Sequence, residues 1–232
     1  TTTVFRDAGI RPTMVYDAVI FDNDGVLSTM TDQSVLARAV RAAFADLGVT
    51  DPDPADVEEL CFGVTPETLS AVADRYGLAE RTLWLRRDLR SSLVQEREIR
   101  AGRKALYDDV AALGRIDRPM GVVSSNQHRT VRTVLEATGL AGQFETVYGR
   151  EMDPRSLHRK KPNPHYLHRA IEDLGAENPL FVGDSESDVG AAAAAGVDSV
   201  FLRRDHRADL TLTREPTYEI ETLAALPELV SS

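Results

Sequence analysis

Short apolar runs alternate with segments of helical period along most of this 232-residue chain, and this alternation restricts the fold more than any other feature. An apolar run of a few residues bounded by turn signals is typical of a buried strand, and strands separated by helices form parallel sheets. Six strands are predicted, over residues 17–21, 120–124, 146–148, 180–182, 199–202 and 217–220. Three helices are predicted, over residues 126–138, 164–175 and 185–196, and a glycine marks the end of each. The sequence therefore predicts an α/β protein with a Rossmann-like parallel sheet flanked by helices on both faces.

Residues 31–114 interrupt this alternation, because the stretch has helical periodicity throughout. Apolar side chains recur at a spacing of 3.6 from Val35 to Leu47, and Thr65–Pro66 is typical of the start of a second helix. Residues 83–99 and 105–113 supply further helical segments. We interpret an all-helical block inserted after the first strand of an α/β domain as a cap. The predicted division is an α/β core over 15–30 and 115–232, a helical cap over 31–114 and an N-terminal extension over 1–14.

The net charge of the chain restricts the kinds of macromolecule or membrane that it can bind. The chain has 27 basic and 37 acidic residues, hence a formal net charge of -10. Proteins that bind nucleic acids or anionic membranes need a basic surface, so we expect neither partner. The single cysteine, Cys61, excludes an intrachain disulfide and a thiolate zinc cluster. We find neither a signal peptide at the N-terminus nor an apolar run of the ~18 residues that a membrane span needs, so we expect a cytoplasmic protein.

Lysine is scarce in this chain: only Lys104, Lys160 and Lys161 are lysines among the 27 basic residues. An acidic, arginine-rich and lysine-poor composition is typical of proteins from salt-rich cytoplasms, and a GC-rich genome favours the same codons. The composition leaves both explanations open.

The first predicted strand ends in two carboxylates, Asp22 and Asp24, followed by Gly25. The carboxyl ends of parallel strands are where α/β sheets bind ligands, and a sharp bend at the glycine lets both carboxylates reach one pocket. An ordinary Asp-Gly turn is the alternative explanation.

A second strand end and a segment before a helix offer groups that suit a phosphate. Ser124, Ser125 and Asn126 end the second predicted strand at the start of a helix, where a hydroxyl suits a phosphate oxygen; an ordinary helix cap is the alternative. Lys161 is held before a helix by two prolines.

A third strand end is acidic. Gly183-Asp184 closes a strand, and Asp188 follows four residues after Asp184. Together with Asp22, these carboxylates would make an oxygen-rich site that suits Mg²⁺.

These four motifs, in this order, resemble those of the haloacid dehalogenase superfamily, whose members are mostly phosphatases. The resemblance covers residues from about 17 to 202, and the helical insertion lies where that family has its type-one cap. The matching residues are Asp22-x-Asp24-Gly25-Val26, Ser124, Lys161-Pro-x-Pro and Gly183-Asp184-Ser-x-x-Asp188.

The resemblance implies catalytic roles. Asp22 matches the nucleophile, which forms an aspartyl-phosphate, and Asp24 matches the group that protonates the leaving group and then activates water. Lys161 and Ser124 match the residues that hold the phosphoryl group. The charge of Lys161 would also neutralise the equatorial oxygens during transfer.

The resemblance also implies a metal site. Asp184 and Asp188 match the Mg²⁺ ligands or their supports. The carboxylate that matches Asp22 and the backbone carbonyl that matches Asp24 usually complete the ligand set.

The function that these matches imply is Mg²⁺-dependent hydrolysis of a small phosphorylated metabolite, most similar to the phosphoglycolate phosphatase and phosphoglucomutase-like branch. A dehalogenase is disfavoured, because those relatives lack an acid at the position of Asp24. A phosphosugar mutase of the same fold and a non-catalytic binding module stay open as alternatives. The sequence predicts neither the particular substrate nor the oligomeric state.

Three features around the cap stay open. Gly63 falls where type-one caps place a specificity loop, or it ends a helix. The segment Arg81–Lys104 has eight basic and three acidic residues; we expect a solvated helix paired with the acidic stretch 51–59, with contact between some arginines and an anionic substrate as the alternative. The histidines His158, His165 and His168 indicate zinc only weakly, because no fourth ligand is evident.

Overall fold

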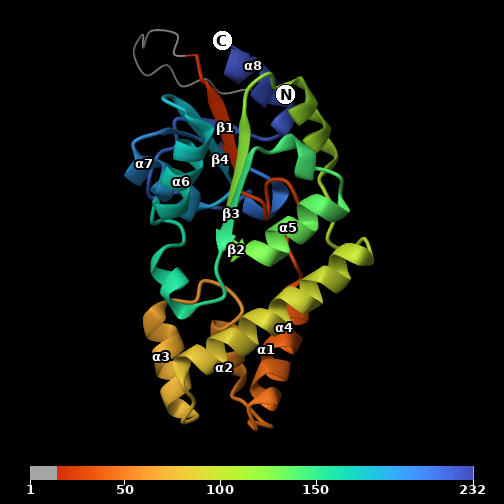
Figure 1. Ribbon diagram of the computed structural model, residues 1–232, viewed down its shortest axis with the longest axis vertical. Coiled ribbons are helices and arrows are strands. Elements are labelled where there is room, and N and C mark those ends of the chain that lie inside the picture. The colour runs from red at the N-terminus through yellow and green to blue at the C-terminus, as the bar shows by residue number, and fades with distance from the viewer. Residues whose placement is uncertain (1–14, 232) are drawn as a thin grey trace.

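The computed structural model describes residues 15–231, which form a sheet domain and a helical lobe (Figure 1). The predicted parallel sheet is confirmed: six strands lie in the order β3-β2-β1-β4-β5-β6, and every neighbouring pair is parallel. This order places the first strand next to the second and the fourth, so three of the predicted motifs begin on adjacent strands. The strands are β1 (Ala18–Phe21), β2 (Met120–Gln127), β3 (Thr146–Arg150), β4 (Pro179–Gly183), β5 (Asp198–Leu202) and β6 (Tyr218–Ile220).

Helices cover both faces of the sheet, as predicted. Successive strand residues point to opposite faces, so Val19 and Phe21 of β1 lie in one apolar cluster and Ile20 lies in another. The first cluster includes residues of α5 (His128–Ala137), α8 (Leu226–Ser231) and the 3-10 helix η1 (Asp108–Arg115). The second includes residues of α6 (His165–Leu174) and α7 (Glu186–Ala195). Four shorter 3-10 helices are η2 (Ala141–Gln143), η3 (Pro154–His158), η4 (Asp205–Arg207) and η5 (Leu223–Ala225).

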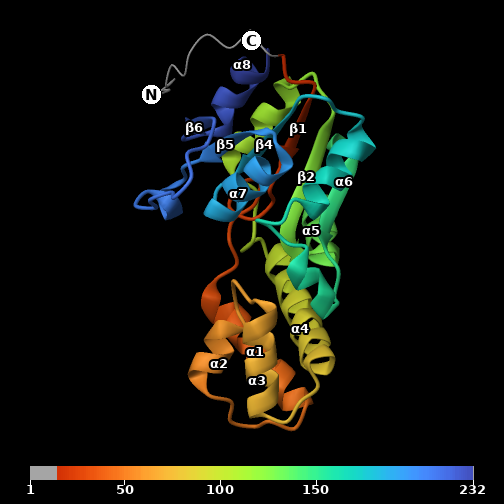
Figure 2. The ribbon, with the colours of Figure 1, turned by 90° about the vertical axis from the view of Figure 1, so that its left-hand side faces the viewer.

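Four helices form a lobe beyond the carboxyl ends of the strands (Figure 2). They are α1 (Gln33–Asp46), α2 (Pro54–Glu59), α3 (Pro66–Arg75) and α4 (Glu80–Arg100). They share an apolar cluster in which Phe44, Leu83 and Trp84 are almost fully buried. The predicted helical cap is therefore present as a packed unit.

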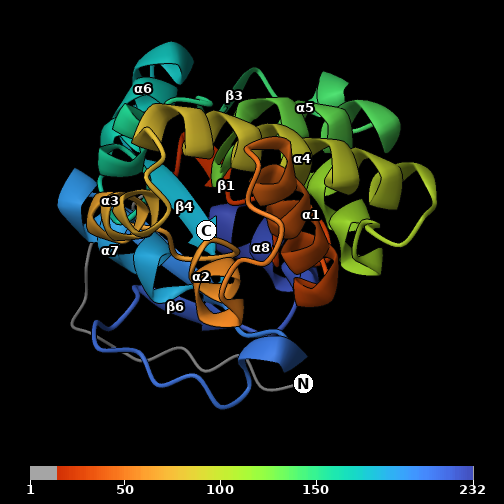
Figure 3. The same cartoon turned by 90° about the horizontal axis from the view of Figure 1, so that it is seen from below.

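Helix α4 connects this lobe to the sheet domain. Its first turns contribute Leu83 and Trp84 to the cap cluster, and its later turns lie against α5, as seen from below in Figure 3. At that contact the Thr130 hydroxyl donates to Ser92 Oγ over 3.2 Å.

Two predicted elements differ from the structure. Strand β2 continues to Gln127, and α5 begins two residues later than predicted, because Gln127 pairs with Arg150 of β3 after a register shift. The helix predicted over 105–113 is instead η1, and its Val110 and Leu113 pack in the first sheet cluster. The domain boundary at residue 114 stays a proposal, and this packing favours a boundary before η1. The predicted extension over 1–14 lies outside the described residues, and within residues 15–231 no helix combines the length and apolarity of a membrane span.

Candidate active site

A tight turn at the end of β1 places the first predicted carboxylates. The amide of Asp22 donates to the carbonyl of Val182 in β4 over 2.8 Å, which fixes the chain as it leaves the sheet. Gly25 then has a φ of +84°, and a Cβ atom at that position would lie 2.3 Å from Asp184 Oδ2. Only glycine allows both this backbone conformation and this close approach, so the predicted bend is present and lies against another motif.

Three buried carboxylates converge at this edge of the sheet. Oxygen atoms of Asp22, Asp184 and Asp188 all lie within 4.8 Å of one another. The start of α7 fixes Asp188, whose Oδ2 accepts from the amide of Ser185 over 3.0 Å in a capping box. A Cβ atom at position 183 would lie 2.2 Å from the Cβ of Asp188. Glycine at this position therefore leaves the room that the Asp188 side chain needs.

Lys161 provides the positive charge inside this group. Its Nζ lies 2.9 Å from Asp22 Oδ1 and 2.5 Å from Asp188 Oδ1, and it donates to the Val123 carbonyl over 3.2 Å. Burial by itself would lower the pKa of Lys161, but the two carboxylates raise it above its ordinary value. The lysine therefore stays protonated between them.

The charge of Asp22 is poorly compensated by its surroundings. Burial raises its pKa to about 7; Lys161 opposes this, whereas Asp188, Asp184 and Asp24 add repulsion. Hard carboxylate oxygens are the ligands that Mg²⁺ prefers, and a divalent cation would offset the repulsion among these groups. Asp22, Asp184 and Asp188 therefore fit a Mg²⁺ site.

A loop after β5, outside all four predicted motifs, also reaches this site. His206 Nε2 lies 2.8 Å from Asp184 Oδ2, and Arg207 Nε donates to the same oxygen over 3.0 Å. Neither residue belongs to a motif, so local sequence gave no signal for this contact.

Asp24 has a separate environment, and its carboxylate is not part of the acidic group. The buried Lys104 forms an ion pair with Oδ1, and the amide of Asn126 donates to Oδ2 over 2.8 Å. Burial would raise the pKa of Asp24, but the charge and hydrogen bond of Lys104, together with the bond from Asn126, lower it below its ordinary value. Asp24 is therefore ionised here, and metal binding through its backbone carbonyl stays a prediction.

The three polar residues after Val123 are still part of strand β2, so the expected position at a helix N-terminus is wrong. Ser124 is buried, and its Oγ accepts from the amide of Asn126 over 3.2 Å. Ser125 lines a cavity, and its buried hydroxyl has no hydrogen-bond partner among the described residues. Phosphate binding by Ser124, Ser125 and Asn126 stays a prediction.

This cavity, of about 180 Å³, lies between the cap and the core. Asp24, Ser125 and Asn126 line it from the core. Helix α4 and residues 61–64 line it from the cap. The position of Gly63 on its wall favours the specificity-loop interpretation over a simple helix end.

The arginine-rich segment does not pair with the acidic stretch 51–59 as expected. Arg90 pairs with Asp46 of α1, whereas Arg100 and Arg103 pair with Glu96 and Glu98 close by. The physical reason is proximity: Glu96 lies one helical turn from Arg100, Glu98 is close to Arg103 just past the end of α4, and α1 packs directly against α4.

Two other members of this segment, Arg87 and Lys104, are buried rather than solvated, and Arg87 lines the cavity. No candidate metal group within residues 15–231 includes the three histidines considered for zinc.

The fold and the four motifs define a class of enzyme. Residues 16–196 match the family model of the haloacid dehalogenase-like hydrolases, and the chain belongs to this family. The family predicted from the motifs is thus confirmed, as is the predicted enzyme class, a hydrolase of the phosphatase branch.

Two relatives match nearly the whole chain. The 5'-nucleotidase of Pseudomonas aeruginosa is 27% identical, over 98% of this chain and 99% of the relative. The phosphoglycolate phosphatase of Neisseria gonorrhoeae is 32% identical, over 91% of each chain. Among solved structures, CbbY from Rhodobacter sphaeroides in complex with phosphate superposes with a TM-score of 0.67 at 19% identity, covering 91% of this chain and 96% of that one. This similarity extends through both the sheet domain and the cap, and it supports the fold.

Proposed function

We propose that this protein is a Mg²⁺-dependent phosphatase that hydrolyses a small phosphomonoester through a phosphoryl-Asp22 intermediate. The proposal rests on the buried group of Asp22, Asp184 and Asp188 around Lys161, at the carboxyl edge of the sheet. The names of the relatives support a phosphomonoester as substrate, and phosphoglycolate is the first candidate.

Each residue has a distinct task in the proposed reaction. An Asp22 carboxylate oxygen forms a bond to phosphorus while the bond to the ester oxygen breaks. Lys161 and Ser124 hold the phosphoryl oxygens, and Mg²⁺ bound by the three carboxylates would supply further positive charge there. Asp24, on the cavity side, is ionised in this structure; once it has taken up a proton, it gives that proton to the leaving oxygen. It then takes a proton from the water that cleaves the phosphoryl-Asp22 bond, which releases phosphate, restores the Asp22 carboxylate and returns Asp24 to its acid form.

Phosphate release from an aryl phosphate and from phosphoglycolate, each with Mg²⁺ and after thorough chelation, tests this function. We expect free phosphate from at least one ester with Mg²⁺ and none after chelation. A mutase would convert a sugar phosphate to its isomer with little free phosphate, and a binding module would release none. Full activity in the chelated sample would contradict the proposed metal dependence.

A further inference from the structure

The cavity between the cap and the core has polar groups that the proposed reaction does not use. Trp84 Nε1 and Ser91 Oγ have no hydrogen-bond partner within the described chain, and both residues line this cavity. Each residue is only 1% exposed, so bulk water does not replace the missing partner. Buried polar groups are normally hydrogen-bonded, and an unpartnered pair on one cavity wall indicates a ligand that accepts hydrogen bonds.

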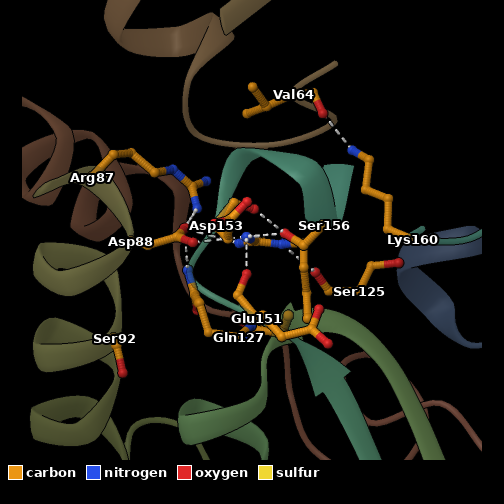
Figure 4. A network of polar contacts seen from close by, with 12 residues as sticks. Val64, Arg87, Asp88, Ser92, Ser125, Gln127, Glu151, Asp153, Ser156 and Lys160 are labelled. Atoms are coloured by element: carbon orange, nitrogen blue, oxygen red, sulfur yellow. Dashed lines mark hydrogen bonds and ion pairs between the residues drawn. The ribbon is translucent and has the colours of Figure 1, made fainter. Parts of the chain in front are cut away.

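Lys160 adds an unpaired charge to the same cavity. Its Nζ donates to the Val64 carbonyl over 2.5 Å, and no carboxylate of residues 15–231 forms an ion pair with it. Burial, with the positive charges of Arg150 and Arg87, lowers its pKa to about 8. An ammonium has three N–H donors, so two remain available. Figure 4 shows the side chain extending toward Val64, apart from the network around Asp88.

The neighbouring arginines keep this wall positive without binding a ligand themselves. Arg150 of β3 forms two bonds to Asp88 of α4, over 2.7 and 2.8 Å, and Arg87 reaches the same carboxylate over 2.9 Å. Figure 4 shows the Arg87 guanidinium directed at the Asp88 carboxylate. Arg87 also donates to the carbonyls of Leu60 and Cys61. One carboxylate thus serves two arginines, and Lys160 has none among residues 15–231.

We propose that Lys160, Trp84 and Ser91 form a subsite for a second anionic group, a carboxylate or a second phosphate, on the leaving group of the substrate. The inference rests on the proposed function, because Asp24 and the subsite lie on the same cavity. The anion accepts hydrogen bonds from the ammonium, the indole N–H and the Ser91 hydroxyl. A neutral leaving group would leave the charge of Lys160 uncompensated.

Calorimetric binding to an Asp22→Asn protein tests the subsite without turnover. Two matched pairs of esters differ in the second anion: 3-phosphoglycerate against glycerol 3-phosphate, and fructose 1,6-bisphosphate against fructose 6-phosphate. With Mg²⁺ at pH 7, the anionic member of at least one pair should bind about tenfold more tightly, as a charge-assisted contact predicts. The pair that shows the preference identifies the anion as carboxylate or phosphate.

Further substitutions in the Asp22→Asn protein show which residues cause the preference for the ester with the second anion. Lys160→Met should reduce it to less than about threefold, Ser91→Ala should weaken it, and Lys160→Arg should retain most of it because the charge is kept. Arg159→Met is the matched control, since Arg159 is exposed and adjacent in sequence, and it should leave the preference intact.

Three outcomes would overturn the subsite. They are equal binding of the two esters in both pairs, no binding of any of the four esters, and a preference for the anionic ester that survives Lys160→Met. These outcomes are independent of catalysis. Failure of the proposed function would appear instead as no phosphate release by the protein with Asp22 intact.

Discussion

The ammonium of Lys104 forms an ion pair with the carboxylate of Asp24, across 80 residues of sequence. The same ammonium donates to the Thr29 carbonyl over 2.7 Å, and the backbone amide of Thr29 donates to the Ala105 carbonyl over 2.8 Å. Lys104 therefore joins the two chain segments that connect the cap to the core, and it does so at the proposed acid–base residue. Because the pair holds Asp24 ionised, a proton must reach Asp24 before it can protonate a leaving group.

Lys104→Met should raise the pKa of Asp24, since it removes the ion pair and the hydrogen bond that lower it. A larger fraction of Asp24 is then protonated at a given pH. At high pH, kcat/KM for an alkyl phosphate falls because Asp24 of the free protein loses its proton. This alkaline limb of the pH profile should therefore move to higher pH. A pH–rate profile measures this shift.

Arg103→Met serves as the control for this profile, because Arg103 is exposed and pairs with Glu98 instead. It should leave the alkaline limb in place. If Lys104→Met leaves the limb unchanged as well, Lys104 does not control the proton on Asp24.

Asp22→Asn should abolish turnover, because an amide cannot attack phosphorus. Phosphate release from an aryl phosphate, measured at saturating Mg²⁺, checks this expectation. Residual activity within about tenfold of the parent would reject Asp22 as the nucleophile.

Asp24→Asn should lower turnover of an alkyl phosphate by about 10²–10⁴, the usual contribution of general acid–base catalysis. An aryl phosphate should lose less, because its leaving group scarcely needs a proton. A phosphoryl-Asp22 species should accumulate, since activation of water is also impaired, and mass spectrometry would detect it. Equal losses on both esters with no trapped species would mean that Asp24 has a structural or metal-binding role only.

Mg²⁺ affinity should increase with pH, because protons and the cation compete for Asp22. Its pKa is raised to about 7, so below that pH the metal-free site is protonated and each unit of acidification should weaken binding by up to about tenfold. Above it, the dependence should level off. Calorimetric titration with Mg²⁺ at pH 5.5, 6.5 and 8 measures this trend, and a constant affinity over that range would show that Asp22 does not compete with a proton there.

Local sequence was sufficient to predict the acidic group, for a physical reason. Asp22 and Asp184 each follow a strand directly, and the carboxyl ends of parallel strands meet at one edge of a sheet. The strand pairing of β1 with β4 then brings them together without any further information.

Contacts that depend on tertiary packing could not be predicted in this way. Lys104 follows a helix and has no motif around it, so nothing local indicates that it reaches Asp24. The polar run Ser124–Gln127 is typical of a helix cap, but pairing with β3 keeps it extended. Asp88 lies among arginines in the sequence, a pattern typical of a solvated helix face. On α4 it is nevertheless fully buried, where it pairs with Arg150 of β3.

The buried Asp88 network should dominate the stability of the contact between cap and core. Asp88 is 0% exposed and forms ion pairs with Arg87 and Arg150, whose guanidinium groups also lie within 5.0 and 4.6 Å of the Trp84 ring centre. Asp88→Asn keeps the size of the side chain but removes the charge, which leaves two buried guanidinium groups without a carboxylate. Loss of one partner from a buried pair typically costs 3–5 kcal/mol, so we expect the free energy of unfolding to fall by about 3–5 kcal/mol.

The matched control is Asp46→Asn, which breaks the more exposed pair with Arg90 on the cap surface. Surface pairs contribute about 0–1 kcal/mol, so the urea midpoint of this variant should lie close to that of the parent.

The pH dependence of the stability gives a second test. Burial would raise the pKa of Asp88, but the charge and hydrogen bonds of Arg150 lower it, so its contribution is present above the ordinary aspartate pKa and is lost as the pH falls through the depressed value. The stability difference between the parent and Asp88→Asn should therefore be largest near neutral pH and shrink in acid. Equal urea midpoints for Asp88→Asn and Asp46→Asn at pH 7 would show that the cap is held to the core by apolar packing rather than by this network.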